Sequence, residues 1–371
     1  MLRASTRRRL ATSPRLRVAF CCNSRAAEDE FNVEFEPEET IHHVRNAIER
    51  AGWEYLQIEA DEDCYENLRL QRPDIVFNRA EGVRGESRES QIPAFCEMLG
   101  IPYVGSGIMA NAIGLDKPTT KIILEYHGLE TAPFQVFTDP DEPMRTGLGF
   151  PVILKPSHEG SSIGINWDNV VYDEAAFREK LGEMILTYRQ PILVERFIDG
   201  REFSVGLVGN FIGGEEPTVL PVLEVDFSGF PPELGRVLGQ KAKSVFDDSS
   251  NYKCPADIDE ELRKHIEAHA KASFKALGCL DWARLDYRLD GDGELYFLEV
   301  NTLPGIDYDV ARDELSFYPM MWVAAGKTYD DMVREVVQAA LRRNGIFDTP
   351  EMESIVYEKM PRYVRFWRGR Y

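Results

Sequence analysis

The feature that most restricts the fold of this chain is residues 283–305, where two strand-like segments flank a short turn. Side chains alternate between the two faces of a strand, so Arg284 and Asp286 share one face of the first segment, and Glu299 and Asn301 share one face of the second. A hairpin therefore gathers two carboxylates, an amide oxygen and a guanidinium. This set is typical of a Mg²⁺ site that holds nucleotide phosphates. The alternative is a ribbon whose polar face only meets water.

The charge balance limits the partners of the chain. It has 371 residues, of which 43 are basic and 63 are acidic, giving a net charge of −20. This length predicts two or three domains. The net negative charge argues against nucleic acid and anionic membranes as partners, since like charges repel. An anionic substrate must then be bound by a local basic cluster.

The remaining composition indicates a cytoplasmic protein. The six cysteines are scattered without metal-type spacing, and no secretory signal precedes them, which favours reduced thiols. No apolar run reaches the about 18 residues that are needed to span a bilayer. Residues 1–15 are arginine-rich and are predicted to be a disordered leader, with an organelle-targeting segment or a misplaced start as alternatives.

Strands and helices alternate in residues 16–112. The apolar strand 16–21 is followed by a helix that Gly52 ends, and strands at 55–59 and 74–78 precede a helix at 87–99. This alternation predicts an N-terminal α/β domain, with a parallel sheet that is covered on both faces and ends near Asn111.

Two further units are predicted after this domain. Residues 113–200 contain a helix at 116–127, strands at 152–155, 163–166 and 192–197, and a helix at 174–186. Residues 201–345 add several strands, the 283–305 hairpin, and helices at 259–277 and 329–343. Residues 346–371 are expected to form a C-terminal tail. Its last part, 362–371, is basic and aromatic, and a packed terminal strand and a small anion-binding segment are its two interpretations.

A loop of small residues follows Lys155 and runs to Gly164. Small residues let backbone N–H groups approach phosphate oxygens, and a lysine adds a compact positive charge. Lys117 at a helix start and Lys243 in a long irregular segment complete a set of three lysines for a triphosphate. An ordinary Gly-Ser hairpin and solvated surface lysines are the alternatives.

The joint between the second and third units favours a ligand cleft. Glu195 there is suited to accept from an adenine amine, and Glu202 is suited to hold ribose hydroxyls. Backbone groups near Phe197 and Ile198 complete this hinge. Solvated strand edges are the competing interpretation for both glutamates.

Taken in order, these motifs resemble the D-alanine–D-alanine ligase group of the ATP-grasp enzymes. The series comprises Lys117, Lys155 with Glu159-Gly-Ser-Ser-Ile-Gly164, Glu195, Lys243, Arg284-Leu-Asp286 and Glu299-Val-Asn-Thr-Leu-Pro-Gly305. Residues 81–91 and 99–107 also resemble N-terminal segments of that group. The likeness covers residues 16–343 and lies in order and spacing. It implies an ATP-grasp fold, α/β (α+β), behind an N-terminal parallel-sheet domain.

The resemblance also implies roles for residues. ATP is held by the three lysines and the hinge residues, with loop residues Glu159, Gly160, Ser161 and Ser162. Two Mg²⁺ ions, with Mn²⁺ as an alternative, are bound by Asp286, Glu299 and Asn301. The family forms an acyl phosphate that an amine then attacks, and Arg284 and the Gly305 N–H stabilise the oxyanion. Ser161 and Glu81 belong to the first amino acid subsite, and Ser316 meets the carboxylate of the second substrate.

Several positions depart from the family pattern. Ser244 follows Lys243 where the family has a tyrosine, and Glu81 replaces a histidine, which makes the first subsite more attractive to a cation. The N-terminal glutamate of the family has no clear counterpart, and the candidates are Glu28, Glu30 and Glu34. Extra residues separate Gly305 from Ser316.

The expected function is therefore an ATP- and Mg²⁺-dependent ligase that makes a D-alanyl-D-alanine-like dipeptide for peptidoglycan. The alternatives are a ligase for another amino or hydroxy acid pair, and an ATP-binding regulatory protein without turnover. Small-molecule amino acids are the expected partners, and the family implies a homodimer.

Overall fold

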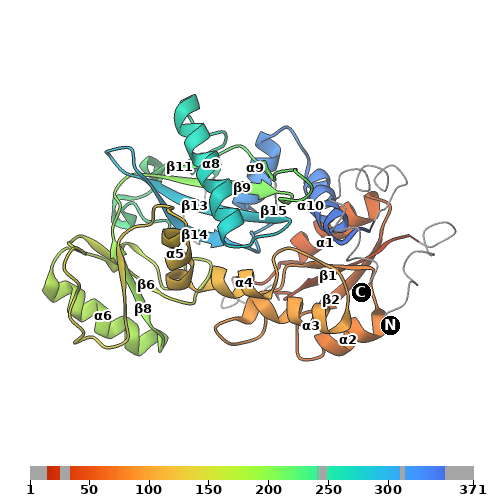
Figure 1. Cartoon of the computed structure of the whole chain (residues 1–371), viewed down its shortest axis with the longest axis horizontal. Helices are drawn as coiled ribbons and strands as arrows, with labels where there is room; N and C mark the ends of the chain where they lie inside the picture. The colour runs from red at the N-terminus through yellow and green to blue at the C-terminus, as the bar shows by residue number, and fades with distance from the viewer. Residues whose placement is uncertain (1–14, 26–33, 240–241, 243–248, 310–313, 347–371) are drawn as a thin grey trace.

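The computed structural model describes residues 15–25, 34–239, 242, 249–309 and 314–346, and they form three sheets and a short hairpin (Figure 1). The predicted leader, the 346–371 tail beyond Ile346, and Lys243 with Ser244 lie outside these residues. Within the described chain, every helix is too short or too polar to cross a bilayer.

The N-terminal sheet is parallel, as predicted. Its strands are β1 (Arg17–Cys22), β2 (Glu54–Glu59), β3 (Ile75–Asn78) and β4 (Tyr103–Val104), in the order β2-β1-β3-β4. All three pairings run parallel. The connections between parallel strands must cross over the sheet, which is why helices alternate with strands here.

Helices cover both faces of this sheet, which confirms the second part of the prediction. Val18 and Phe20 of β1 pack toward α1 (Glu38–Arg50) and α10 (Tyr329–Asn344). Their neighbours Ala19 and Cys21 point to the opposite face, toward α2 (Cys64–Gln71) and α3 (Gln91–Leu99). Because α10 comes from the far end of the sequence, it joins the N-terminal sheet to the C-terminal part of the chain (Figure 1).

The central lobe is an antiparallel sheet in the order β5-β8-β6-β7 with helix α6 on one face (Figure 1). Its elements are β5 (Phe134–Phe137), β6 (Val152–Pro156), β7 (Val170–Val171), α6 (Glu174–Tyr188) and β8 (Ile192–Arg196). Helix α5 (Lys117–Tyr126) leads into the lobe. It begins where predicted, because the Asp116 carboxylate accepts from the Thr119 N–H.

The predicted strand at 163–166 is wrong. Those residues form a turn, followed by the 3-10 helix Trp167–Asn169 and then β7. Gly164 has a φ of 72°, which a strand does not accommodate. The Asn169 side chain also donates to the carbonyls of Leu154 and Gly164, which fixes the turn against β6.

The C-terminal lobe is a six-stranded antiparallel sheet in the order β12-β11-β9-β13-β14, with β10 paired to β9. The strands are β9 (Arg201–Val208), β10 (Thr218–Val219), β11 (Leu223–Val225), β12 (Tyr252–Lys253), β13 (Trp282–Leu289) and β14 (Leu295–Asn301). Helix α8 (Glu260–Ala276) packs across β9 and β13. The 283–305 segment thus forms the predicted hairpin and lies next to β9.

Other predicted boundaries need correction. The helix expected at 87–99 begins at Gln91, after a 3-10 turn at Arg88–Ser90. Helices α2, α4 (Ile108–Leu115) and α9 (Phe317–Ala324) were not predicted. Helices α4 and α9 are apolar around most of their circumference, so they lack the amphipathic periodicity that marks a surface helix. The expected domain end near Asn111 falls inside α4.

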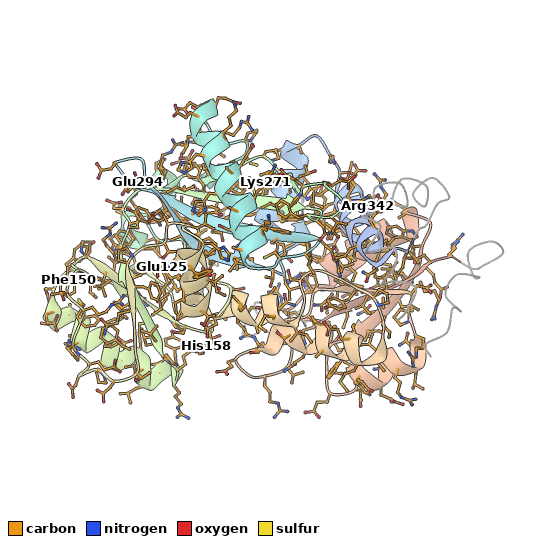
Figure 2. The ribbon with its side chains drawn as sticks, viewed as in Figure 1. Glu125, Phe150, His158, Lys271, Glu294 and Arg342 are labelled. Atoms are coloured by element: carbon orange, nitrogen blue, oxygen red, sulfur yellow. The ribbon has the colours of Figure 1, made fainter. Side chains whose placement is uncertain are left out.

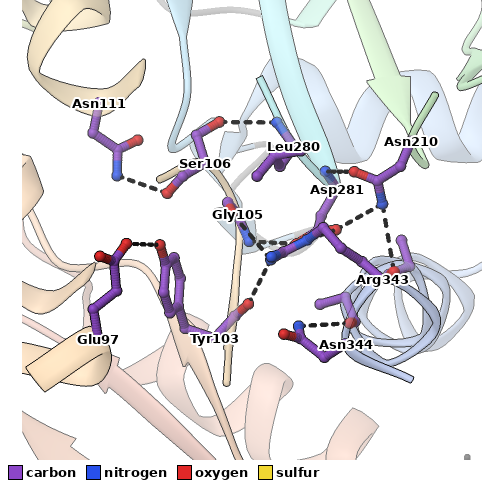
Figure 3. Close-up of polar contacts among 12 residues, drawn as sticks. Glu97, Tyr103, Gly105, Ser106, Asn111, Asn210, Leu280, Asp281, Arg343 and Asn344 are labelled. Atoms are coloured by element: carbon purple, nitrogen blue, oxygen red, sulfur yellow. Dashed lines mark hydrogen bonds and ion pairs between the residues drawn. The ribbon is translucent and has the colours of Figure 1, made fainter. Parts of the chain in front are cut away.

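A buried polar network joins the N-terminal domain to the C-terminal lobe (Figure 3). The Asp281 carboxylate is fully buried and pairs with the Arg343 guanidinium at 2.7 Å and 3.0 Å. It also accepts from the Gly105 N–H at 2.9 Å and from the Asn210 amide at 2.8 Å. Arg343 donates onward to the Tyr103 carbonyl at the end of the parallel sheet. One carboxylate thus links β4, β9 and α10.

Candidate active site

A cavity lies between the central sheet and the C-terminal sheet. Strands β6 and β8 form one wall, and β9, β13 and β14 form the other. It is lined by six of the residues predicted to bind ATP and by three of the predicted catalytic and metal residues. The first set is Lys155, Ser162, Glu195, Phe197, Ile198 and Glu202, and the second is Arg284, Asp286 and Glu299. Residues that are far apart in the sequence therefore meet in one cleft. The cleft lies at the joint between the second and third units, where the sequence predicts it.

One part of the cavity wall is apolar. Ile153, Ile165 and Val237 form a buried cluster against which Phe197 packs, and Leu298 faces them from β14. Flat apolar walls beside a hinge backbone suit an aromatic base. The backbone of Phe197 and Ile198 borders this part, as predicted.

The opposite part of the cavity carries the predicted metal residues. The strand register pairs Arg284 with Asn301 and Asp286 with Glu299, so all four side chains lie on one face. A β-bulge follows at the Asp286–Tyr287 step, a distortion that is common beside active sites. The hairpin geometry thus confirms the shared face that strand alternation predicted.

Asp286 is the centre of this polar group. Its two oxygens accept from the Arg284 guanidinium at 3.0 Å and 3.1 Å. The Ser204 hydroxyl donates to it at 2.5 Å, and the Asn301 amide at 3.1 Å. These contacts hold the carboxylate in one orientation.

The donor chemistry of the hairpin fits Mg²⁺. Asp286, Glu299 and Asn301 offer only oxygen ligands, which are the ligands that hard divalent cations prefer. Among the described residues, no group of three or more His, Cys, Asp or Glu side chains could hold a metal. The hairpin set combines two carboxylates with an amide instead. Mg²⁺ keeps water and phosphate oxygens as further ligands, so two carboxylates and an amide suffice.

Two lysines flank one buried carboxylate of the cavity wall. Glu195 is 1% exposed and pairs with Lys155 and, at 2.8 Å, with Lys121. Burial alone would raise the pKa of Glu195, but the two lysines outweigh it and lower the pKa to about 2. Glu195 therefore stays ionised and holds both ammonium groups. The prediction that it meets adenine remains open.

Lys117 occupies the start of α5, where it is buried and donates to the Glu159 carbonyl. Burial lowers its pKa, and the nearby Glu299 opposes this shift. Lys117 thus sits between the glycine-rich loop and the metal hairpin.

Glu202 is paired with Arg288, which lies directly opposite it on β13. Their ion pair spans 2.7 Å, and Arg288 also donates to the Ile198 carbonyl at 3.3 Å. This places a fixed carboxylate beside the hinge, where ribose binding was predicted.

The glycine-rich loop is anchored at several points. Ser161 and Ser162 both have positive φ values, of 47° and 59°. The buried Ser162 hydroxyl donates to the Leu238 carbonyl at 3.0 Å, whereas Ser161 is exposed. Glu159 accepts from the Gln190 amide at 2.7 Å. A side chain at Gly160 would meet the Glu34 carboxylate at 2.5 Å, so the loop rests on the N-terminal domain.

Two short strands lie between Gly305 and Ser316 among the described residues. Strands β15 (Tyr308–Asp309) and β16 (Glu314–Leu315) pair antiparallel and return the chain to Ser316. A Cβ atom on Gly305 would lie 2.8 Å from the Ser316 hydroxyl, so these two predicted residues are neighbours despite the insertion. The Ser316 hydroxyl donates to Asp307 at 2.9 Å.

Glu81 lies in a buried charged group at the base of the N-terminal domain. The Arg79 guanidinium lies 3.0 Å from the Glu81 carboxylate and 2.6 Å from the Glu36 carboxylate. Burial raises the pKa of Glu81, and Arg79 opposes the shift. Among the predicted N-terminal glutamates, Glu28 and Glu30 lie outside the described residues, and Glu34 pairs with Arg88 at 2.9 Å. Glu36, just before α1, was not predicted.

This charged group makes stability depend on pH. Burial raises the pKa of Glu36 from 4.5 to about 7, and burial with repulsion from Glu81 raises that of Glu89 to about 8. Between about pH 4.5 and about pH 8, the folded chain therefore binds more protons than the unfolded chain. We expect the unfolding free energy to fall as pH rises from about 5 to about 8.

Denaturant melts across this range measure that slope. Glu36→Gln and Glu89→Gln should each flatten it, because neither amide titrates. Glu62→Gln, at an exposed position of the same domain, should leave it unchanged. Equal slopes in all four proteins would contradict the assignment.

Sequence reasoning missed Lys121, Arg288 and the Glu36–Arg79 pair. Lys121 was detectable, because it follows Lys117 by four residues and so lies on the same face of α5. Arg288 was detectable by the period of two that links it to Arg284 and Asp286. Glu36 and Arg79 carry no such signal, since their contact depends on the crossover between β1 and β3.

The comparisons with known proteins agree with this geometry. Residues 123–338 match the family model described as D-ala D-ala ligase C-terminus. A D-alanine–D-alanine ligase of Pelotomaculum thermopropionicum is 32% identical over 89% of this chain and 98% of its own length. An uncharacterised protein of Sinorhizobium fredii, y4sG, is 33% identical over 81% of this chain and 88% of its own length.

A similar fold is found among solved structures. The D-alanine–D-alanine ligase of Bacillus anthracis, in complex with ATP, superposes with a TM-score of 0.67 at 23% identity. The match covers 89% of this chain and 99% of that one. The two chains therefore share a fold.

Proposed function

The chain belongs to the D-alanine–D-alanine ligase family, and on that premise we propose that it is an ATP-dependent ligase that joins the carboxyl group of one amino acid to the amine of another. The product is a dipeptide of the D-alanyl-D-alanine type. The observation that carries the proposal is the meeting of Lys155, Glu202, Asp286 and Glu299 in one cleft between two sheets.

The reaction has two steps. The substrate carboxylate attacks the γ-phosphate of ATP, which releases ADP and gives an acyl phosphate. The amine of the second amino acid then attacks the acyl carbon, loses a proton and expels phosphate. Arg284 and the Gly305 N–H are proposed to stabilise the oxyanion of the tetrahedral intermediate.

The side chains of this cleft are proposed to do the positioning. Lys117 and Lys155 neutralise phosphate charge, and Glu195 holds Lys155 and Lys121 in place. Glu202, fixed by Arg288, takes the ribose hydroxyls. Asp286, Glu299 and Asn301 would hold Mg²⁺, which offsets charge on the phosphates when bound. Lys243, which lies outside the described residues, is proposed to neutralise phosphate charge with the other two lysines, and Ser161 is proposed to orient the first substrate.

Incubation of the purified chain with ATP, Mg²⁺ and D-alanine tests the proposal. We expect phosphate release together with a dipeptide that mass spectrometry identifies. Turnover with other amino or hydroxy acids, but none with D-alanine, would keep the ligase and remove the D-alanine product. Tight ATP binding without turnover on a broad panel of acids would contradict the ligase proposal.

Lys155→Ala is expected to raise the KM for ATP by about tenfold to a hundredfold, the range for loss of a charged hydrogen bond. The lysine faces the cavity, and its loss also leaves Glu195 with Lys121 alone. Steady-state kinetics with varied ATP measures the change. Lys271→Ala removes a lysine of the outer helix α8, where it pairs with Glu216 (Figure 2). This variant should leave the KM for ATP unchanged. Similar KM values in both variants would argue against phosphate contact by Lys155.

We also propose that the chain forms a homodimer through α3 and α4. These helices contact each other and expose Met98 and Met109, each 73% accessible. Exposed methionines on two contacting helices are typical of an interaction surface. Sedimentation of the wild type should give a dimer, and Met98→Lys with Met109→Lys should give a monomer. A monomeric wild type at micromolar concentration would contradict the proposal.

A further inference from the structure

A group of acidic side chains, three of them buried and two half-buried, borders the proposed reaction centre. We call it the acid cluster, and it consists of Glu34, Glu36, Glu81, Glu89 and Asp307. Four of these residues come from the N-terminal domain, and Asp307 comes from the segment after the metal hairpin. Glu36 interacts electrostatically with Asp307 and Glu81. Glu34 interacts with Glu81 and with Glu89, and Glu81 interacts with Glu89.

Two arginines pair with members of the cluster, and the Lys117 ammonium interacts electrostatically with Glu89. Arg79 pairs with Glu36 at 2.6 Å and with Glu81 at 3.0 Å. Arg88 pairs with Glu34 at 2.9 Å and donates to the His158 carbonyl of the glycine-rich loop. Within the described residues, the cluster therefore contains more negative charge than its arginines can balance.

The remaining contacts of the cluster come from neutral groups. Asp307 accepts from the hydroxyls of Thr40 at 3.0 Å and Ser316 at 2.9 Å. Glu89 accepts from the Thr302 hydroxyl at 3.4 Å. A hydroxyl group satisfies an oxygen atom but leaves its charge uncompensated.

Among the described residues, one carboxylate oxygen of the cluster has no hydrogen-bond partner. Glu36 is 2% exposed, and its Oε2 atom is buried without a donor, while Oε1 accepts from Arg79. A buried carboxylate oxygen without a donor is costly, so this atom marks a position for a group that is supplied from outside the chain.

The cluster is placed where a substrate would meet it. Arg79 donates to the Leu303 carbonyl at 3.0 Å, and Thr302 and Asp307 lie on either side of Gly305 in the sequence. The Ser316 hydroxyl, beside Gly305, is bonded to Asp307. The acid cluster thus adjoins the residues that are proposed to hold the acyl group.

We infer that the amino acid bound beside the acid cluster carries a second cationic group besides its α-ammonium, and is therefore a basic amino acid. The inference rests on the proposed ligase function and replaces D-alanine by a basic amino acid in the subsite beside the acid cluster. A single α-ammonium balances one carboxylate, whereas the cluster has three more carboxylates than guanidinium groups. A side-chain cation can reach the unpartnered oxygen of Glu36 or the carboxylate of Asp307.

The titration of the cluster agrees with this assignment. Burial and mutual repulsion raise the pKa of Glu36 to about 7 and that of Glu89 to about 8. Without an added cation, these carboxyl groups take up protons instead.

Matched amino acid pairs test the inference in the wild-type chain. D-lysine is compared with D-norleucine, and D-ornithine with D-norvaline, each with its L form, by phosphate release and mass spectrometry of the product. Each pair has similar shape and differs in the side-chain cation. We expect kcat/KM to favour the cationic member by about tenfold to a hundredfold in at least one pair.

Variants test whether the preference for cationic substrates comes from the acid cluster. Glu36→Gln and Glu81→Gln should each reduce the ratio between cationic and neutral substrate by about tenfold, while Glu62→Gln, on the exposed surface, should preserve it. Circular dichroism and thermal melts establish that the variants fold, and the wild-type comparison holds even where a variant does not.

The outcomes separate two failures. Equal kcat/KM for the cationic and neutral members of every pair, in a chain that turns over ATP, overturns the inference and leaves the ligase proposal standing. Absence of phosphate release with every amino acid overturns both. A preference for cations that survives Glu36→Gln and Glu81→Gln also contradicts the assignment to the acid cluster.

Discussion

Glu299→Ala is expected to lower ATP turnover by about a thousandfold or more while the chain stays folded. Glu299 lies opposite Asp286 in the hairpin and faces the cavity with it. Removal of one of two carboxylate ligands weakens Mg²⁺ binding and leaves phosphate charge without its counterion. Phosphate release measured over a range of Mg²⁺ concentrations should show both a lower maximum and a higher Mg²⁺ requirement.

Glu294→Ala provides the matched control. Glu294 is exposed at the outer end of the same hairpin, away from the cavity (Figure 2). This variant should retain wild-type turnover and Mg²⁺ dependence. Near-normal activity of Glu299→Ala, with the same circular dichroism as the wild type, would contradict the metal assignment.

Arg343→Ala should reduce the free energy of unfolding by about 3 kcal/mol, the lower end of the range for breaking a buried ion pair. The Asp281 carboxylate is fully buried and would lose its only arginine partner among the described residues, keeping neutral donors from Gly105 and Asn210. The loss should be largest at the joint between the N-terminal domain and the C-terminal lobe (Figure 3). Chemical denaturation with hydrogen exchange at β4 and α10 measures both effects.

Arg342→Ala tests whether the effect is specific. Arg342 precedes Arg343 on α10 but is exposed, so its removal should change stability by less than about 0.5 kcal/mol (Figure 2). A similar loss of stability in both variants would mean that α10 helicity, and not the Asp281 pair, determines the result.

The parallel sheet and the hairpin were predictable because their information is local. The alternation of strand and helix gave β1, β2 and β3, and the period of two placed Arg284 and Asp286 on the face of the hairpin that the register shows. The predicted strand at 163–166 failed because two side-chain bonds from Asn169 hold that segment in a turn. Such bonds leave no periodic signal in the sequence.

The candidate site was predictable in part. The residues expected around ATP line one cavity, because the order of motifs along the chain places them at the joint of two sheets. Partners within the site were not predictable, since the pairs Lys121–Glu195 and Arg79–Glu36 join elements by tertiary packing. The closeness of Gly305 and Ser316 also depends on a hairpin that an extra segment forms.

The central claim is that the cleft between β8 and the β13–β14 hairpin holds a metal-bound nucleotide. A crystal structure with ADP and Mn²⁺, recorded with anomalous scattering, tests it most directly. We predict anomalous density within about 2.3 Å of the oxygens of Asp286, Glu299 or Asn301, with adenine against Phe197. Nucleotide bound elsewhere, with this cleft free of both ion and adenine, would contradict the account.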